Sequence, residues 1–193
     1  MIKKVCVYCA SSSKVDLQYV ETARQLGKIL AENNHELVYG GGSVGLMGVL
    51  ADSVLENGGR VTGVIPQFMV DVEWQHNGLT ELVLTETMHG RKQQMLQSSD
   101  AIVALPGGFG TLEELLEAIT WKQLGIHTHP IVIVNVGGYY DNLLAQFQQA
   151  ADELFVRPEH LQMWSVITDV NEILNEIEGV TIIHEDMRRF AKI

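Results

Sequence analysis

Two glycine-rich segments of this sequence contain the residue types needed to bind a small phosphorylated ligand. The segment Pro106–Thr111 follows a short apolar run, and Thr111 is expected to open a helix. The first N–H groups of a helix have no partner within it and carry positive partial charge, so they bind phosphate monoesters. Glycines there let the backbone approach a ligand closely. The expected ligand contacts in this segment are Gly107, Gly108, Phe109, Gly110 and Thr111.

The other segment, Gly40–Gly48, contains the pattern G-x-G-x-x-G, which by itself is a weak signal for a dinucleotide site. The next predicted strand ends at Val64–Gln67 without an acid for a ribose 2′-hydroxyl, and no Gly-Lys-Ser/Thr follows, which excludes a Walker A loop. A tight strand-to-helix turn is the alternative, but a simple turn rarely uses so many glycines. We therefore expect ligand contacts at Gly41, Gly42 and Gly45.

The elements that would position these segments alternate between short apolar strands and helices. The predicted strands are Val5–Ala10, Glu36–Tyr39, Arg60–Ile65, Leu82–Thr85, Ala101–Leu105 and Ile131–Val136. The predicted helices are Leu17–Asn33, Gly45–Asn57, Met88–Ser98, Thr111–Leu124 and Tyr140–Glu153, with a weaker one at Asp169–Ile177. The longest irregular stretch, Pro66–Gly78, is a candidate lid.

This alternation predicts an α/β fold with a doubly wound parallel sheet, helices on both faces, and one Rossmann-like nucleotide-binding domain over residues 1–193. Ligands of such sheets bind at the carboxyl ends of the strands. The two glycine-rich segments should therefore share one crevice.

Composition narrows the class of partner. The 193 residues carry a formal net charge of −11, and an acidic chain binds nucleic acid poorly, because that affinity comes largely from Lys and Arg. No apolar stretch approaches the ~20 residues of a membrane-spanning helix, and Met1–Lys4 leads into a strand rather than a signal peptide.

Cys6 and Cys9 fit a reducing, cytoplasmic compartment. Their C-x-x-C spacing imitates a redox motif, but residues three apart in a strand point to opposite faces and cannot pair.

The segment His127–His129 is a weak hint of a metal site. Two histidines without a third ligand at a recognisable spacing favour loop residues before Pro130. We expect neither a metal nor a cofactor.

Three motifs together resemble one known family. Residues 88–95 fit M-x-x-R-K-x-x-M, residues 106–114 fit P-G-G-x-G-T-x-x-E, and residues 40–48 read G-G-G-S-V-G-L-M-G. In this order and spacing they are similar to the "lonely guy" family, the cytokinin riboside 5′-monophosphate phosphoribohydrolases, many of which carry an older label as lysine decarboxylases. The likeness runs from about Val5 to Ile177, and the tail from about residue 180 has none of it.

The resemblance implies a Rossmann-like fold, at least a homodimer, and hydrolysis of AMP or N6-substituted AMP to a free base and ribose 5-phosphate. It implies that Arg91 and Glu114 are the catalytic pair. The further expected contacts with the nucleoside 5′-monophosphate substrate are Glu73, Lys92, Glu113 and Thr120. For Glu73 a solvated loop acid is an equal alternative, and Thr120 could simply pack.

The chemistry agrees with these roles. Breaking an N-glycosidic bond develops positive charge on the ribose. Glu114 could stabilise that charge and orient or deprotonate the attacking water. The fixed fork of donors on Arg91 suits a phosphate or an adenine ring nitrogen that gains electron density.

Structural alternatives exist for both residues. Thr111–Glu114 also fits a T-x-x-E capping box, in which Glu114 would only bond the backbone of Thr111. Arg91 and Lys92 could be an exposed helix start, although the helix dipole disfavours cations there and a nearby phosphate would resolve that conflict. Glu113 and Glu117 could belong to a solvated face.

Two other function classes compete with the hydrolase. A nucleotide carrier of the same fold would need the glycine segments but not the Arg91–Glu114 pair. A pyridoxal-phosphate decarboxylase needs a Schiff-base lysine and an acid on the ring nitrogen, and Lys92 is the only lysine near the expected site.

One helix is more apolar than one sheet face needs, which suggests a two-fold dimer interface; its apolar residues are Leu112, Leu115, Leu116, Ile119 and Trp121.

Overall fold

The computed structural model describes residues 2–71 and 74–179. Two expectations lie outside these residues: Glu73 as a substrate contact, and the separate character of the tail from about residue 180. Among the described helices, none combines the length and apolarity needed to cross a bilayer.

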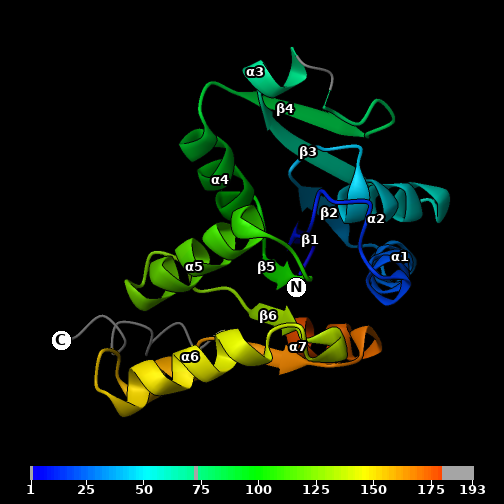
Figure 1. Ribbon diagram of the computed structural model, residues 1–193. Coiled ribbons are helices and arrows are strands. Elements are labelled where there is room, and N and C mark those ends of the chain that lie inside the picture. The colour runs from blue at the N-terminus through cyan, green and yellow to red at the C-terminus, as the bar shows by residue number, and fades with distance from the viewer. Residues whose placement is uncertain (1, 72–73, 180–193) are drawn as a thin grey trace.

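The described residues form one seven-stranded sheet in which every pairing is parallel, with the order β4-β3-β2-β1-β5-β6-β7 (Figure 1). The strands are β1 Lys4–Tyr8, β2 Glu36–Tyr39, β3 Val61–Pro66, β4 Glu81–Thr85, β5 Ala101–Ala104, β6 Ile131–Val134 and β7 Ser165–Ile167. The order reverses at β1, whose neighbours are β2 and β5. The carboxyl ends of these strands are the expected ligand position for a doubly wound sheet.

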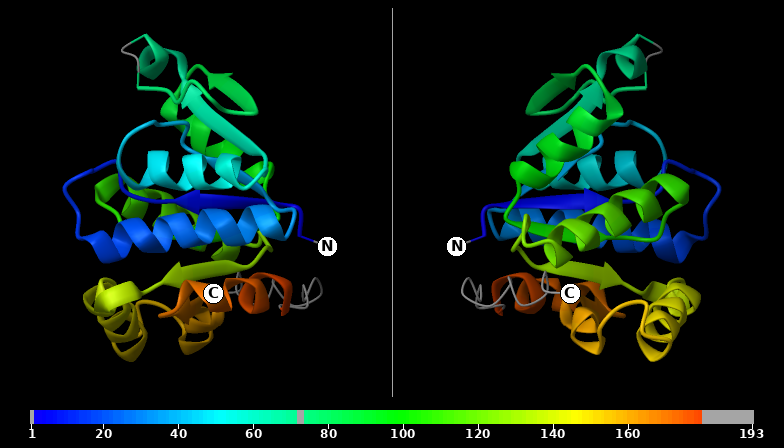
Figure 2. Two further views of the ribbon diagram at one scale, coloured as in Figure 1. Left: turned by 90° about the vertical axis from the view of Figure 1, so that its right-hand side faces the viewer. Right: turned by 90° about the vertical axis from the view of Figure 1, so that its left-hand side faces the viewer.

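The α-helices are α1 Leu17–Glu32, α2 Gly45–Glu56, α3 Gln67–Val70, α4 Met88–Gln97, α5 Phe109–Gln123, α6 Asp141–Asp152 and α7 Ile173–Gly179. Helices α1, α2 and α7 pack on one face of the sheet, and α4, α5 and α6 pack on the other (Figures 1 and 2). Each face therefore has its own apolar core, and the central strands are buried on both sides. This confirms the predicted doubly wound α/β fold.

Most predicted boundaries are correct to within one or two residues. The helix predicted over Asp169–Ile177 is wrong at its start, because Val170–Glu172 form a 3-10 turn and α7 begins at Ile173. Smaller differences concern three other elements. Helix α5 begins at Phe109 rather than Thr111. The stretch Pro66–Gly78 contains the short helix α3. Strand β7 was not predicted, because its three residues give no usable periodicity.

The two cysteines are free and buried, and they lie in different cores. Cys6 belongs to the core under α4 and α5, and Cys9 to the core under α1 and α2. Burial raises the pKa of the Cys6 thiol to about 12 and raises that of Cys9 further. Thiolate chemistry is therefore disfavoured, as expected for a structural pair rather than a redox motif.

Candidate active site

The two glycine-rich segments meet at the carboxyl edge of the sheet through the turn after β1. The Ala10 N–H donates to the Pro106 carbonyl oxygen at 3.3 Å, and the Ala10 carbonyl accepts from the Met47 N–H, also at 3.3 Å. Met47 lies in the first turn of α2, directly after the Gly40–Gly45 segment. Backbone hydrogen bonds between residues far apart in the sequence therefore bring the two glycine-rich segments together.

Arg91 and Glu114 form a buried ion pair at this edge. Arg91 lies on α4, whose N-cap Thr87 accepts the Gly90 N–H at 3.0 Å, and Glu114 lies on α5. Arg91 Nη1 stands 2.7 Å from Glu114 Oε1, and Arg91 Nε donates to the Val64 carbonyl at 3.0 Å. The two residues are only 7% and 8% exposed. Their conformations are thus fixed before any ligand binds.

The first glycine segment makes room for this pair. A Cβ atom on Gly40 would collide with the Arg91 guanidinium. Gly40 was not among the predicted site residues, because the sequence does not indicate that an arginine from another helix packs against it. The pattern G-x-G-x-x-G was the available signal.

Burial and the neighbouring Arg91 have opposite effects on the pKa of Glu114. Burial raises the pKa of this carboxyl above its ordinary value, and the attraction of Arg91 offsets only part of that effect. A carboxyl whose pKa is moved toward neutrality is suited to exchange protons at physiological pH.

Lys92 joins α4 to α5 through two carboxylates. Its Nζ contacts Glu113 Oε1 and lies 3.2 Å from Glu117 Oε1. Burial alone would lower the pKa of Lys92, but the two carboxylates outweigh it and the pKa lies above its ordinary value. The repulsion expected between Glu113 and Glu117 is therefore relieved by Lys92. The helix dipole disfavours two cations near the start of α4, and it is the acids of α5, rather than a phosphate, that compensate their charge.

The capping-box interpretation of Glu114 is wrong. Helix α5 has Gly108 as its N-cap, no side chain caps it, and its first turn contains no acid. Thr111 is buried in that first turn, under Gly107, where a Cβ would meet the threonine side chain. Glu114 lies further into the helix and points to Arg91, so its partner comes from another helix and not from the local backbone.

The glycines divide into two groups by their surroundings. Gly41 and Gly45 have φ of 76° and 68°, and an added Cβ on Gly42 would meet the Met47 side chain, so packing and backbone conformation alone require glycine there. An added Cβ on Gly108 or Gly110 would meet nothing within 4 Å. No described residue therefore covers this side of the α5 N-terminus, and Phe109 between the two glycines is 93% exposed.

Thr120 is not brought to the pair by any described contact. Its hydroxyl donates to the Leu116 carbonyl at 2.7 Å within its own helix, and the residue is exposed. Its contact with substrate stays a prediction, as do the ligand contacts of the other expected residues.

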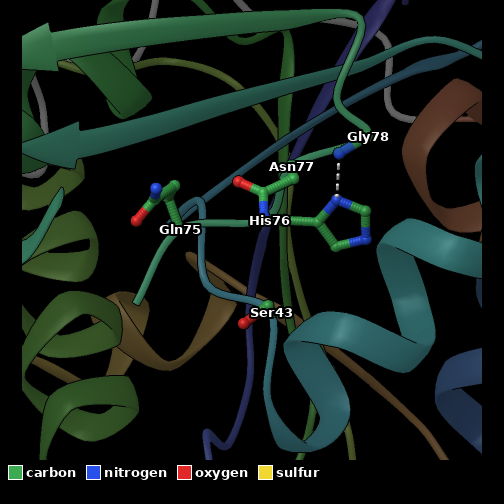
Figure 3. Close-up of a pocket in the computed structure, with 5 residues that line it drawn as sticks. All are labelled: Ser43, Gln75, His76, Asn77 and Gly78. Atoms are coloured by element: carbon green, nitrogen blue, oxygen red, sulfur yellow. Dashed lines mark hydrogen bonds between the residues drawn. The ribbon is translucent and has the colours of Figure 1, made fainter. Parts of the chain in front are cut away.

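A polar cavity of about 480 Å³, which the sequence analysis did not predict, lies on the α2 side of the first glycine segment (Figure 3). It is lined by Ser43, Gln75, His76, Asn77 and Gly78. The segment that follows residue 73 is attached to the glycine segment there: Ser43 N–H donates to the Trp74 carbonyl at 3.2 Å, and His76 N–H donates to the Gly41 carbonyl at 2.8 Å. His76 Nδ1 accepts the Gly78 N–H at 3.0 Å, so its Nε2 bears the proton that faces Asp52 at 2.9 Å.

His127 and His129 do not assemble a metal site with other described residues, since no cluster of three or more potential ligands occurs among them. The His127 ring is buried, and burial lowers its pKa to about 3, so it is neutral at physiological pH.

Comparisons with known proteins identify the family. A family profile described as "Possible lysine decarboxylase" matches residues 47–177. The probable cytokinin riboside 5′-monophosphate phosphoribohydrolase LOGL1 of Oryza sativa subsp. japonica is 44% identical over 95% of this chain and 82% of its own length. The cytokinin riboside 5′-monophosphate phosphoribohydrolase LOG2 of Arabidopsis thaliana is 43% identical over 95% of this chain and 86% of its own length.

A solved structure agrees on the fold. The molybdenum cofactor carrier protein of Chlamydomonas reinhardtii has a TM-score of 0.71 at 20% identity, covering 93% of this chain and 98% of that one. At that identity the likeness concerns the fold alone. The curated relatives match almost the whole chain at more than 40% identity, and on that basis the chain belongs to the cytokinin riboside 5′-monophosphate phosphoribohydrolase ("lonely guy") family.

Proposed function

We propose that this protein hydrolyses the N-glycosidic bond of adenosine 5′-monophosphates, with or without an N6 substituent, to release the free base and ribose 5-phosphate. The observation that carries the proposal is the buried Arg91–Glu114 pair at the edge where both glycine segments meet. Pure nucleotide binding does not require a buried carboxylate. The names of the curated relatives support the same activity.

In this reaction Glu114 acts on the ribose and on water. The bond from C1′ to the base nitrogen breaks, its electron pair goes to the base, and the oxygen of water bonds to C1′. The ionised carboxylate stabilises the positive charge that develops on the ribose and accepts a proton from the water. The released base gains a proton in exchange, so protons balance.

Arg91 supports the leaving base and holds Glu114. The fixed donor fork of its guanidinium already bonds Glu114 and the Val64 carbonyl, so the carboxylate is oriented before substrate arrives. Such preorganisation is worth more in a buried site, where water does not screen the charges. Lys92 and Glu113 extend this network at the more exposed end, where Glu113 is within reach of a ligand.

The 5′-phosphate binds at the uncapped N-terminus of α5. The N–H groups of the first turn lack partners within the helix, and Gly108 and Gly110 leave the approach open. Phe109 and Thr111 belong to the same turn. The proposed contacts of the first glycine segment with the substrate are Gly41, Gly42 and Gly45, and Glu73 is a further proposed contact.

The test is release of free base and ribose 5-phosphate from AMP and from N6-isopentenyl-AMP. Wild type is compared with Glu114→Gln, which keeps the shape of the side chain but removes its charge, and with Glu21→Gln on the exposed surface of α1 as a matched control. We expect Glu114→Gln to lose at least ~100-fold in kcat and the control to match wild type. Tight AMP binding by a wild type that releases no base would instead favour the carrier alternative.

We further propose a cytoplasmic homodimer. The helix that suggested an interface is largely used within the chain: Leu115 and Ile119 are buried in the core, and Leu112 and Trp121 pack against it. Leu116 stays 42% exposed. The proposal therefore rests on less exposed apolar surface of α5 than expected, although Phe109 at the start of this helix is also exposed. A monomeric mass in light scattering at micromolar concentration would refute it. The free thiols fit the reducing compartment.

A further inference from the structure

Three consecutive carbonyl groups, from Leu105 after β5 to Gly107 in the glycine turn before α5, each accept a hydrogen bond from a distant part of the chain. The Leu105 carbonyl accepts the hydroxyl of Tyr140 at 2.7 Å, and the Gly107 carbonyl accepts the hydroxyl of Tyr139 at 2.7 Å. Between them, the Pro106 carbonyl accepts the Ala10 N–H at 3.3 Å. Three consecutive carbonyls therefore face protein donors, and none of them is left to face an anion.

Both tyrosines belong to the connection after a different strand, β6. They lie between the short helix Val136–Gly138 and α6. The sequence analysis did not single them out, because nothing in the chain near residue 139 indicates a contact with residue 107.

The segment that carries the tyrosines is itself rigid. The Tyr140 N–H donates to Asn135 Oδ1 at 2.7 Å, and Asn135 Nδ2 donates to Asp141 Oδ1 at 2.7 Å. The Asn135 N–H donates to the Ile167 carbonyl at 2.7 Å, which ties the segment to β7. Tyr140 is 1% exposed, and the Tyr139 ring lies edge-on to it with centroids 5.0 Å apart. The two hydroxyls are thus held at fixed positions.

Holding the carbonyls sets the direction of the N–H groups. A turn that can rotate its peptide groups presents either carbonyl oxygens or N–H groups to a ligand, and only N–H groups attract an anion. In each peptide group the N–H points away from the carbonyl, so the bond from Tyr139 to the Gly107 carbonyl also fixes the direction of the Gly108 N–H. The requirement is strongest at Gly107 and Gly108, since glycine backbone is otherwise free to rotate.

We propose that Tyr139 and Tyr140 are positioning residues, which hold the Pro106–Thr111 turn in the orientation that binds the 5′-phosphate of the substrate. They act through the turn and touch no reacting atom. This inference rests on the proposed phosphate position at α5. It predicts that the tyrosine hydroxyls affect binding of the phosphate and not the chemical step.

The first experiment is Tyr139→Phe, which removes one hydroxyl and keeps the ring. Tyr19→Phe is the matched control, because the Tyr19 ring lies against that of Tyr139, at a centroid distance of 5.7 Å, and loses the same group. Tyr139 is 43% exposed, so we expect the variant to fold, with a melting temperature close to wild type. The steady-state kinetics are measured with AMP and N6-isopentenyl-AMP.

We expect Tyr139→Phe to raise KM for both substrates by the same factor, about three- to tenfold, as the loss of one net hydrogen bond implies, with kcat within twofold of wild type. Inhibition by the product ribose 5-phosphate should weaken by that factor, and inhibition by free adenine should not. A purely structural role would not separate these two inhibitors.

Four results are informative. The KM increase with unchanged kcat supports the inference. A wild type that hydrolyses AMP, with Tyr139→Phe matching Tyr19→Phe, overturns it and leaves the proposed function intact. If wild type binds AMP without hydrolysis, the proposed function fails, and the AMP dissociation constants measured by calorimetry then test the positioning role. Three- to tenfold weaker AMP binding by Tyr139→Phe supports that role. Equal affinity of wild type and Tyr139→Phe for AMP overturns it. A wild type that neither hydrolyses nor binds AMP overturns both.

Discussion

Removing Arg91 should leave Glu114 as an uncompensated buried acid, and the stability of the protein should then depend on pH in a defined direction. The perturbation is Arg91→Met, which keeps an apolar stem and deletes the guanidinium. The two side chains are 8% and 10% exposed and lie 2.7 Å apart. Breaking such a buried pair costs about 3–5 kcal/mol when the remaining charge stays ionised. We expect a loss of about 3 kcal/mol in the free energy of unfolding at pH 8.

The loss should shrink in acid. Without Arg91, the pKa of Glu114 rises further above the ordinary value of 4.5, since the attraction that offset burial is gone. An acid with a raised pKa in the folded state binds its proton more tightly there than in the unfolded chain. The stability lost at high pH is therefore regained as pH falls through that raised pKa. The free energy of unfolding of the variant should change with pH by up to about 1.4 kcal/mol per pH unit between 4.5 and the raised pKa of Glu114.

The assay is urea unfolding of wild type and variant at several pH values between 5 and 8, with the m-value monitored as a check on two-state behaviour. Arg24→Met is the control, because Arg24 is half exposed, 3.7 Å from the exposed Glu21, and should lose about 0.5 kcal/mol or less. Adding Glu114→Gln to Arg91→Met should restore most of the stability at pH 8. A loss below about 1 kcal/mol with no pH slope would mean that Glu114 is solvated, and would refute the argument from burial.

Three further predictions follow from single contacts. Gly40→Ala should lower kcat/KM at least ~10-fold, because its methyl group must displace the Arg91 guanidinium. Gly40→Ala combined with Arg91→Met should show no further loss beyond that of Arg91→Met alone. The free energy of unfolding of the wild type should rise between pH 8 and 10.5, because burial lowers the pKa of Lys122 from 10.5 to about 8. Urea titrations of Lys122→Met, which also loses the bond from Lys122 Nζ to the His129 carbonyl, should not show this rise. In the pH profile of kcat/KM, the acid limb should have its midpoint above pH 4.5, because 4.5 is the ordinary pKa of a glutamate and the pKa of Glu114 is raised. A midpoint at or below pH 4.5 would exclude Glu114 as the ionised group that the reaction requires.

Periodicity and turn residues were enough to predict most of the fold. Apolar runs such as Ile131–Val134 are buried on both faces and therefore have a pattern that identifies a central parallel strand. Helix α1 begins where Asp16 accepts the Gln18 N–H, a local signal that the sequence contains. The weak or absent signals belong to β7 and α3, which are short and depend on tertiary packing for their existence.

What the sequence determined by itself about the site is the set of chemical groups: two glycine-rich turns, Arg91 and Lys92 on one helix, and the acids Glu113 and Glu114 on another. Tertiary structure decided which of these groups meet. Local reasoning allowed Glu114 to be a helix cap, but the packing of α4 against α5 brings Arg91 to within 2.7 Å and makes it half of a buried pair. The same holds for Gly40 under Arg91 and for Tyr139 at Gly107, because these contacts join residues that are far apart in the chain, and no local pattern records a partner at that separation.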